Sequence, residues 1–158
     1  MRISAVIIDA AAWDDPDVQR LTSDQQAEIR ARYGGKEEPG RPPSAADVSV
    51  VLVARDDDGA ALGCGALRDL GKGVAEVKRM YVPPAARGRG VSKAVLAGLE
   101  AAARSRGWRT LRLETGPLQP EAIGLYSGAG YRPIDAFGAY TGDPDAVDSL
   151  FFEKALGD

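Results

Sequence analysis

Three β-rich segments follow one another closely between residues 48 and 82, and they constrain the fold more than any other feature. The segments are Val48–Ala54, Ala61–Leu67 and Val74–Val82, and the turns between them are rich in Asp and Gly. Short, turn-rich connections of this kind are typical of antiparallel hairpins. The sequence therefore predicts three antiparallel strands in succession.

Helical and strand patterns flank these three strands. A strand at Ile3–Asp9 and a helix that begins near Pro16 and ends at Gly34-Gly35 precede them. The later elements are a helix from Val91 to about Arg106, a strand at Thr110–Glu114, a helix beginning at Pro120 and a strand at Leu150–Ala155. The predicted fold class is α/β, of the α+β type, with a mixed, mostly antiparallel central sheet flanked by helices in the order β-α-β-β-β-α-β-α-β. With 158 residues, the chain is expected to form a single domain, 1–158.

The amino-acid types in the chain limit the catalytic and metal sites that it can form. The chain contains no histidine and one cysteine, Cys64. A Ser-His-Asp or Cys-His couple, the usual zinc site and an intrachain disulfide are therefore excluded. Cys64 lies in an apolar strand pattern, which predicts a packed thiol rather than a nucleophile. No metal site is expected.

Charge is segregated along the sequence. Residues 1–60 hold 7 basic against 12 acidic residues, residues 61–118 hold 11 against 4, and residues 119–158 hold 2 against 7. The middle of the chain is thus basic and both flanks are acidic, which indicates either solvated surfaces or an anionic and a cationic ligand. A nucleic-acid partner is disfavoured by the acidic flanks and by the aromatic content of 6%.

No export signal and no apolar run of about 20 residues is found, so a cytoplasmic protein without a membrane segment is expected.

The junction EVKRMYVPPAARGRGVSKAVLAGLE, residues 76–100, carries the clearest functional signal. A proline pair ends the strand, and the basic, glycine-containing loop RGRGVS, residues 87–92, leads into a helix. Free backbone N–H groups and the positive end of the helix dipole make such a helix start an anion site. The spacing fits neither a Walker loop nor a dinucleotide fingerprint. A generic basic loop and a nucleic-acid contact remain alternatives.

This junction resembles the acyl-CoA pyrophosphate loop of the GCN5-related N-acetyltransferases (GNAT), R/Q-x-x-G-x-G/A. Arg87 and Gly90 match, while Ser92 stands where glycine or alanine is usual. The strand before the loop, LRLETG and PEAIGLYSGAGYRPI extend the resemblance over about residues 48–155. The resemblance implies acetyl-CoA as co-substrate and direct transfer of its acetyl group to an amine.

The resemblance also implies which residues bind acetyl-CoA. A splayed strand end would pair its backbone with the pantetheine arm and polarise the thioester carbonyl, and loop N–H groups would bind the pyrophosphate. The expected residues are Met80, Tyr81 and Val82 in the strand, and Arg87, Gly88, Arg89, Gly90, Val91 and Ser92 in the loop.

Acetyl transfer involves two proton transfers, one from the attacking amine and one to the departing CoA sulfur, and each needs a candidate side chain. Tyr126 matches the family tyrosine near the CoA sulfur and is expected to act as the acid, against the alternative that it only packs. Glu76 matches an acidic position used as the base, against a salt bridge with Lys78 or Arg79. Glu114 is the second candidate base, with structural hydrogen bonding as its alternative.

The acceptor side is less defined. Trp13, Tyr33 and Tyr140 are candidate pocket residues that would otherwise pack, and Trp108 is assigned to the core. The charge map predicts a small cationic amine as acceptor, with Glu37 and Glu38 near its entrance. A protein or peptide amine remains an alternative acceptor, and a non-catalytic acyl-CoA sensor remains an alternative function. A homodimer is also left open.

Overall fold

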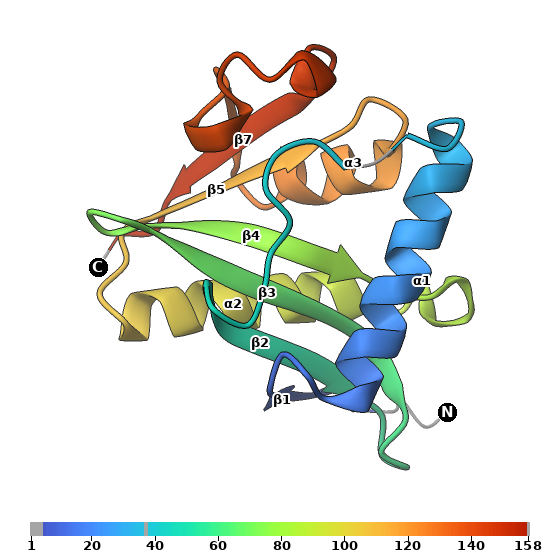
Figure 1. Cartoon of the computed structure of the whole chain (residues 1–158). Coiled ribbons are helices and arrows are strands. Elements are labelled where there is room, and N and C mark those ends of the chain that lie inside the picture. Colours follow the sequence, from blue (N-terminus) through green and yellow to red (C-terminus); the bar gives the residue numbers. More distant parts are fainter. Residues whose placement is uncertain (1–4, 37, 158) are drawn as a thin grey trace.

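The computed structural model describes residues 5–36 and 38–157. The predicted antiparallel strands are β2 (Val48–Arg55), β3 (Ala61–Gly71) and β4 (Val74–Tyr81), paired in sequence order (Figure 1). They lie within a seven-stranded sheet of order β1-β2-β3-β4-β5-β7-β6. Every neighbouring pair is antiparallel except β4 and β5. The mixed, mostly antiparallel sheet is therefore confirmed.

The other elements follow the predicted order with one addition. They are β1 (Ile7–Ala10), α1 (Pro16–Arg32), α2 (Val91–Ser105), β5 (Thr110–Thr115), α3 (Pro120–Gly128), β6 (Arg132–Ile134) and β7 (Leu150–Ala155). The added strand is β6, which has three residues and pairs with β7. Its central proline and its short length give no alternating pattern, so the sequence does not reveal it. The expected first strand begins at Ile3, but residues 1–4 lie outside the described residues.

Capping explains where α1 begins and ends. The Asp15 carboxylate accepts hydrogen bonds from the backbone N–H groups of Asp17, at 2.9 Å, and Val18, at 3.4 Å. An aspartate at this position satisfies N–H groups that have no partner within the helix. After the helix, Gly34 and Gly35 adopt φ of 65° and 89°, a left-handed conformation that ends it.

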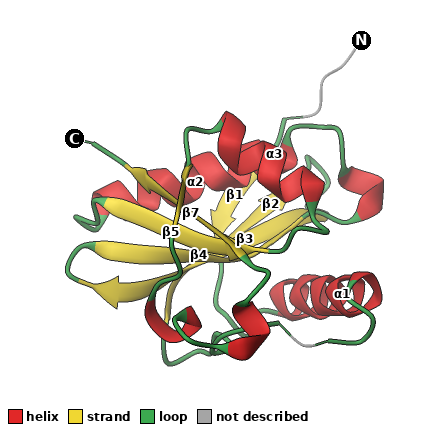
Figure 2. Ribbon diagram, turned by 90° about the horizontal axis from the view of Figure 1, so that it is seen from above, coloured by secondary structure: helices red, strands yellow, loops and turns green. Residues whose placement is uncertain are grey.

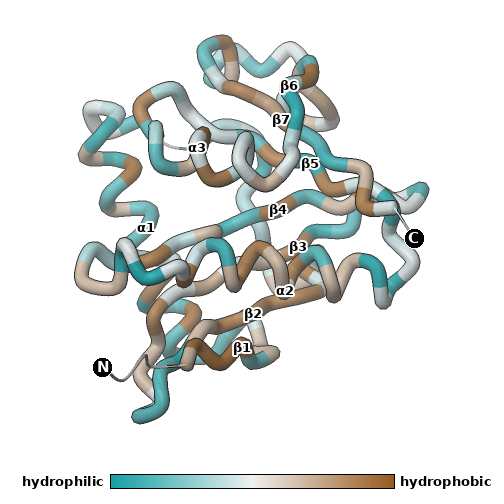
Figure 3. The backbone as a smooth tube through the Cα atoms, turned by 180° about the vertical axis from the view of Figure 1, so that it is seen from behind, coloured by the Kyte–Doolittle hydropathy of each residue, from teal (hydrophilic) through white to brown (hydrophobic). Residues whose placement is uncertain are grey.

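Helices cover both faces of the sheet (Figure 2). On one face, α2 packs Val91, Val95 and Leu99 into the main core, and α3 adds Tyr126. On the other face, α1 buries Val18 and Leu21 against β2 and β3. Hydrophobic residues accordingly concentrate along the strands and α2, while the connecting loops are mostly hydrophilic (Figure 3). Trp108 packs against the main core as expected.

The connection between β6 and β7 contains the 3-10 helices Gly138–Tyr140 and Pro144–Ala146. Phe137, Tyr140, Ala146 and Phe151 form a small third core there, with the aromatic rings edge to face. No helix in the part of the chain that the structure describes is long and apolar enough to cross a membrane.

Candidate active site

Strands β4 and β5 separate along their length, and this separation positions the site. They pair only from Val74 to Glu76 in β4 and from Thr110 to Arg112 in β5. Beyond these residues the carboxyl ends of the two parallel strands diverge, and the sheet opens between them (Figure 1). In the part of the chain that the structure describes, β4 therefore has no ladder partner on its β5 side after Glu76, and pairing of the Met80–Val82 backbone with acetyl-CoA stays a prediction.

A β-bulge shapes the same end of β4. Cys64 of β3 pairs with Tyr81, whereas Ala66 pairs with Lys78, so β4 carries one extra residue between these positions. Arg79 adopts a φ of 57° in the bulge. The bulge carbonyls are satisfied from outside the ladder, because the Cys64 thiol donates to the Arg79 carbonyl at 3.4 Å and the Gln25 amide donates to the Met80 carbonyl at 2.7 Å.

The predicted donor loop lines a cavity of about 240 Å³ beside the end of β4. Of the expected acetyl-CoA residues, all except Arg89 contribute to its wall; they are Met80, Tyr81, Val82, Arg87, Gly88, Gly90, Val91 and Ser92. Arg89 is exposed and does not belong to this wall.

The loop geometry fits a diphosphate. Gly88 and Gly90 have φ of 79° and 75°, and a Cβ at either position would meet no heavy atom within 4 Å. Gly90 is the N-cap of α2, and no side chain caps this helix. Uncapped N–H groups and the helix dipole at an open, glycine-lined helix start are suited to an anion.

The side chain of Arg87 attaches the loop to the neighbouring elements. One guanidinium nitrogen, Nη2, donates to both carboxylate oxygens of Glu28 in α1, at 2.8 and 3.0 Å, and Nε donates to the Val82 carbonyl at 2.9 Å. The Arg87 backbone N–H donates to the Pro84 carbonyl at 3.3 Å. The side chain therefore fixes the loop against α1 and the end of β4, and the free N–H groups follow it in the chain.

A second cavity, of about 530 Å³, adjoins this smaller cavity. The residues that line both are Gln25, Ile29, Met80, Gln119, Ala122 and Tyr126. Tyr33 also lines the larger cavity, and its hydroxyl accepts a hydrogen bond from the Leu118 N–H at 3.0 Å. Trp13 instead packs against the core beneath α1. The shared residues place the junction of the cavities between α1, β4 and α3.

Tyr126 lies at this junction. Its side chain is buried against Tyr131, with the ring centroids 5.6 Å apart. Burial, with a smaller contribution from the negative charge of Glu114, raises the pKa of Tyr126 well above its usual range. The phenol therefore holds its proton more tightly than a solvent-exposed tyrosine does.

Glu114, at the end of β5, lines the larger cavity. Burial raises the pKa of its carboxyl to about 7, and a Ser149 hydrogen bond and the charge of Lys78 offset part of this effect. A carboxylate with this pKa accepts a proton efficiently near neutral pH. Glu114 and Tyr126 thus combine a proton acceptor and a proton donor at connected cavities.

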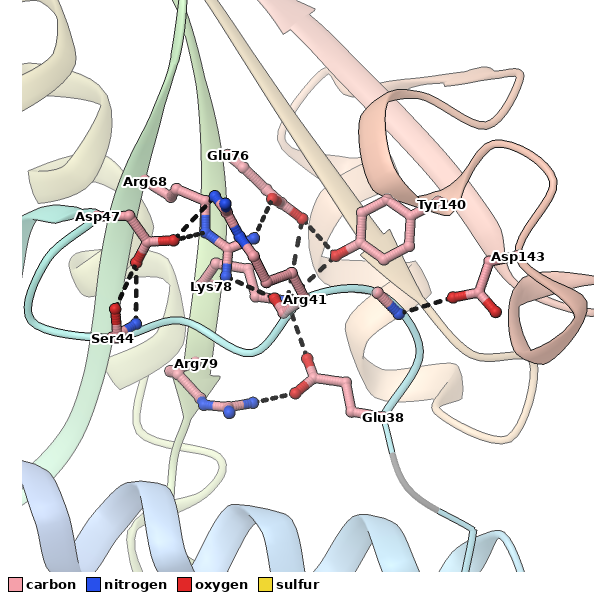
Figure 4. A network of polar contacts seen from close by, with 11 residues as sticks. Glu38, Arg41, Ser44, Asp47, Arg68, Glu76, Lys78, Arg79, Tyr140 and Asp143 are labelled. Carbon is pink, nitrogen blue, oxygen red and sulfur yellow. Dashed lines mark hydrogen bonds and ion pairs between the residues drawn. The ribbon is translucent and has the colours of Figure 1, made fainter.

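Glu76 occupies a different environment. It is 1% exposed and is not among the residues that line either cavity. Its carboxylate accepts a hydrogen bond from the Tyr140 hydroxyl at 2.5 Å and forms ion pairs with Arg68 at 3.4 Å and Lys78 at 3.9 Å (Figure 4). The structure therefore places Glu76 and Tyr140 in a buried polar network below the larger cavity.

The sequence did not predict that Glu38 joins this network. Glu38 lines the larger cavity, as expected for an entrance residue, but its carboxylate is bonded to Lys78 at 3.0 Å and to Arg79 (Figure 4). Glu37 lies outside the described residues. The acidic residues of this cavity that form no ion pair with another described residue are Glu114, Asp145 and Asp148. In the described residues, no cluster of His, Cys, Asp and Glu is suited to a metal ion.

Comparisons with known proteins agree with this geometry. Residues 11–131 match the model of the Acetyltransferase (GNAT) family. An IAA acetyltransferase of Azospirillum brasilense is 44% identical over 106 residues, which cover 66% of this chain and 67% of that protein. A solved structure from Klebsiella pneumoniae, proposed to be an acyl-CoA N-acyltransferase, is 37% identical with a TM-score of 0.81, and the match covers 96% of this chain and 98% of the other.

The fold also extends to more distant proteins. A GNAT family acetyltransferase from Elizabethkingia anophelis, solved with acetyl-CoA bound, has a TM-score of 0.67 at 16% identity over 95% of this chain and 97% of its own. This likeness concerns the fold. The family model, which covers most of the chain, carries the assignment: the chain belongs to the acetyltransferase (GNAT) family, and its co-substrate is acetyl-CoA.

Proposed function

We propose that this enzyme transfers the acetyl group of acetyl-CoA directly to the primary amine of a small cationic molecule. The observation that carries the proposal is the junction of the two cavities, where Tyr126 is shared and Glu114 lines the larger cavity. The glycine loop and the end of β4 would hold the co-substrate in the smaller cavity, and the larger cavity would receive the acceptor.

Glu114 is proposed as the base. An alkyl ammonium group has a pKa near about 10.4, so it must lose a proton before its nitrogen can attack. The Glu114 carboxylate would take that proton, directly or through water, and the amine lone pair would then form a C–N bond with the thioester carbon. Glu76 is a weaker candidate because its carboxylate is held by Tyr140, Arg68 and Lys78.

Tyr126 is proposed as the acid. As the C–S bond breaks, its hydroxyl would donate a proton to the departing CoA sulfur, a role supported by its position at the junction of the two cavities. A backbone N–H at the open end of β4 would stabilise negative charge on the carbonyl oxygen. No covalent enzyme intermediate is needed, which agrees with a chain that contains no histidine and a buried Cys64.

The charge of the larger cavity supports a cationic acceptor. The acidic residues Glu114, Asp145 and Asp148 line this cavity. Of the basic residues in its described wall, Lys78 and Arg79 are paired with Glu38, which leaves Lys36. Attraction between these acidic groups and an ammonium group acts mainly on capture, so kcat/KM for the amine should fall as salt rises.

An acceptor screen that follows CoA thiol release tests this function. The panel contains putrescine, n-butylamine, γ-aminobutyrate, a peptide with a free amine, and IAA because the Azospirillum relative carries that name. Turnover that is highest with putrescine supports the proposal. Preference for the peptide or IAA would contradict the acceptor assignment, and acetyl-CoA binding without thiol release across the panel would favour a sensor.

The remaining predictions extend this proposal. We infer that the chain acts as a single domain in the cytoplasm, and that it binds neither nucleic acid nor membrane. A homodimer stays a prediction that light scattering of the purified enzyme would check.

A further inference from the structure

Two consecutive cations of β4 bind the same carboxylate. Lys78 donates to one oxygen of Glu38 at 3.0 Å, and Arg79 pairs with the other oxygen. In a regular strand successive side chains point to opposite faces of the sheet, so neighbours cannot reach one partner in this way. The bulge, with Arg79 at a φ of 57°, turns both side chains to the face that carries the larger cavity.

Lys78 and Arg79 belong to the wall of this cavity, yet their charges are covered. Their side chains are 4% and 10% exposed, and that of Glu38 is 18% exposed. Burial raises the pKa of Glu38, but the charges of Lys78 and Arg79 outweigh burial and leave its pKa below the usual value. Glu38 is therefore an anion held between two cations at the edge of the acceptor space.

Glu38 comes from residues 38–47, which we call the strap. The strap lies between α1 and β2 in the sequence and crosses the face of the sheet (Figure 1). It has further attachments, because Gly40 N–H donates to Asp143 at 3.0 Å and Arg68 donates to the Arg41 carbonyl at 2.7 Å. Asp47, at its end, pairs with Arg68 at 3.2 Å. The strap is thus fixed at several points that do not involve Glu38.

We propose that Glu38 determines the charge selectivity of the acceptor site by neutralising the Lys78–Arg79 pair. With Glu38 in place, the unneutralised charge of the cavity is mostly acidic, which favours an acceptor whose tail is cationic. Without this carboxylate, the same pair becomes a binding site for a carboxylate, since an arginine fork and a neighbouring ammonium group bind carboxylates through charge-assisted hydrogen bonds. The inference rests on the proposed function and deepens it by naming the residue that selects the acceptor class.

Glu38→Gln tests the inference with three acceptors of similar length. Putrescine, n-butylamine and γ-aminobutyrate carry a positive, neutral and negative tail on the same kind of primary amine. We expect the kcat/KM ratio of γ-aminobutyrate to putrescine to rise by about 10- to 100-fold in the variant, as expected for uncovering the Arg79 guanidinium beside Lys78, which keeps its 3.9 Å ion pair with Glu76. The value for n-butylamine should change much less than either charged acceptor.

Matched variants separate selectivity from a general loosening of the site. Asp47→Asn removes another strap carboxylate that pairs with a buried cation, but it lies outside the cavity wall, so its acceptor ratio should equal that of the wild type. The double variant Glu38→Gln/Arg79→Gln removes the newly uncovered guanidinium and should return the ratio toward the wild-type value. Glu38→Asp keeps the charge but withdraws it by one methylene, and it provides a milder variant if Glu38→Gln does not fold.

Calorimetric binding of putrescine and γ-aminobutyrate to the CoA-bound enzyme provides a readout besides turnover. If the wild type acetylates amines but the ratio is the same in Glu38→Gln, the inference is wrong while the proposed function stands. If no amine is acetylated but the binding ratio shifts as expected, the proposed function fails while the selectivity role stands. An equal shift in Asp47→Asn, or no return in the double variant, would also overturn the inference.

Discussion

Replacement of Glu114 by Gln tests the proposed base and its buried charge together. Gln has nearly the same shape but neither ionises nor accepts the proton of an ammonium group. For the wild type, kcat/KM should increase with pH up to about 7, the pKa to which burial raises this carboxyl. Glu114→Gln should lose this ascending limb and about 10²-fold in kcat, a usual magnitude for one proton transfer.

The same pKa makes a separate prediction for stability. A carboxyl whose pKa is raised by folding stabilises the folded state fully below its unfolded-state pKa, and this contribution disappears as pH rises through the folded-state pKa. For Glu114 these values are 4.5 and about 7. Because each pH unit between them corresponds to about 1.36 kcal/mol, the wild type should lose up to about 3 kcal/mol relative to Glu114→Gln across this window.

Urea unfolding of both proteins at a series of pH values measures this difference. Glu114→Gln should become progressively more stable relative to the wild type as pH rises, and the change should level off above neutral pH. Asp14→Asn, an exposed carboxylate outside both cavities, controls for a general effect of removing one negative charge. A stability difference that does not vary with pH would show that the Glu114 carboxyl is not destabilised by burial, and an unchanged kcat/KM profile would exclude it as the base.

Three further substitutions address the other parts of the site. Gly90→Asp should abolish acetyl-CoA binding in calorimetry because a carboxylate would occupy phosphate space, whereas Gly90→Asn, with the same backbone strain and no charge, should retain more of it; equal losses would refute the electrostatic reason. Tyr126→Phe should lower kcat by about 10²-fold with little change in melting temperature, and near-normal turnover under chemistry-limited conditions would remove its role as acid. Gly116→Ala would place a Cβ against the Tyr33 hydroxyl, so the ring must shift; KM for the amine should rise while acetyl-CoA affinity stays constant, and an unaffected KM would show that Tyr33 does not contact the acceptor.

Local sequence signals predicted most of the fold correctly. The Asp15 cap, the Gly34-Gly35 stop and the helical spacing of α2 act over a few residues, so they can be recognised without tertiary information. The strand β6 was not predicted because its three residues, centred on Pro133, are too few to show an alternating hydrophobic pattern. Boundaries of the longer elements differed by a few residues at most, with β3 extending to Gly71 instead of Leu67.

The candidate site was predictable where it follows one continuous segment. The loop after β4 is such a segment, and the structure gathers its residues around one cavity. The acceptor side brings together α1, the strap, β4, β5 and the turn before β7, and their contacts depend on the folded topology. Tyr33, a candidate pocket residue from the sequence, lines the larger cavity, as does Ile29, which no local pattern distinguishes from a packed residue of α1.

The bulge in β4 lies where the two cavities meet, and no local sequence pattern predicts it. A left-handed backbone at a residue other than glycine costs about 1 to 2 kcal/mol, so the surrounding structure must hold Arg79 in place. Cys64 and Gln25 do so by donating to the two bulge carbonyls, and Glu38 does so through the guanidinium. Burial raises the pKa of the Cys64 thiol to about 12, which keeps its proton available for that hydrogen bond and prevents it from acting as a nucleophile. The lone cysteine thus acts through the backbone: it helps to maintain the turn that orients Lys78 and Arg79 toward the larger cavity.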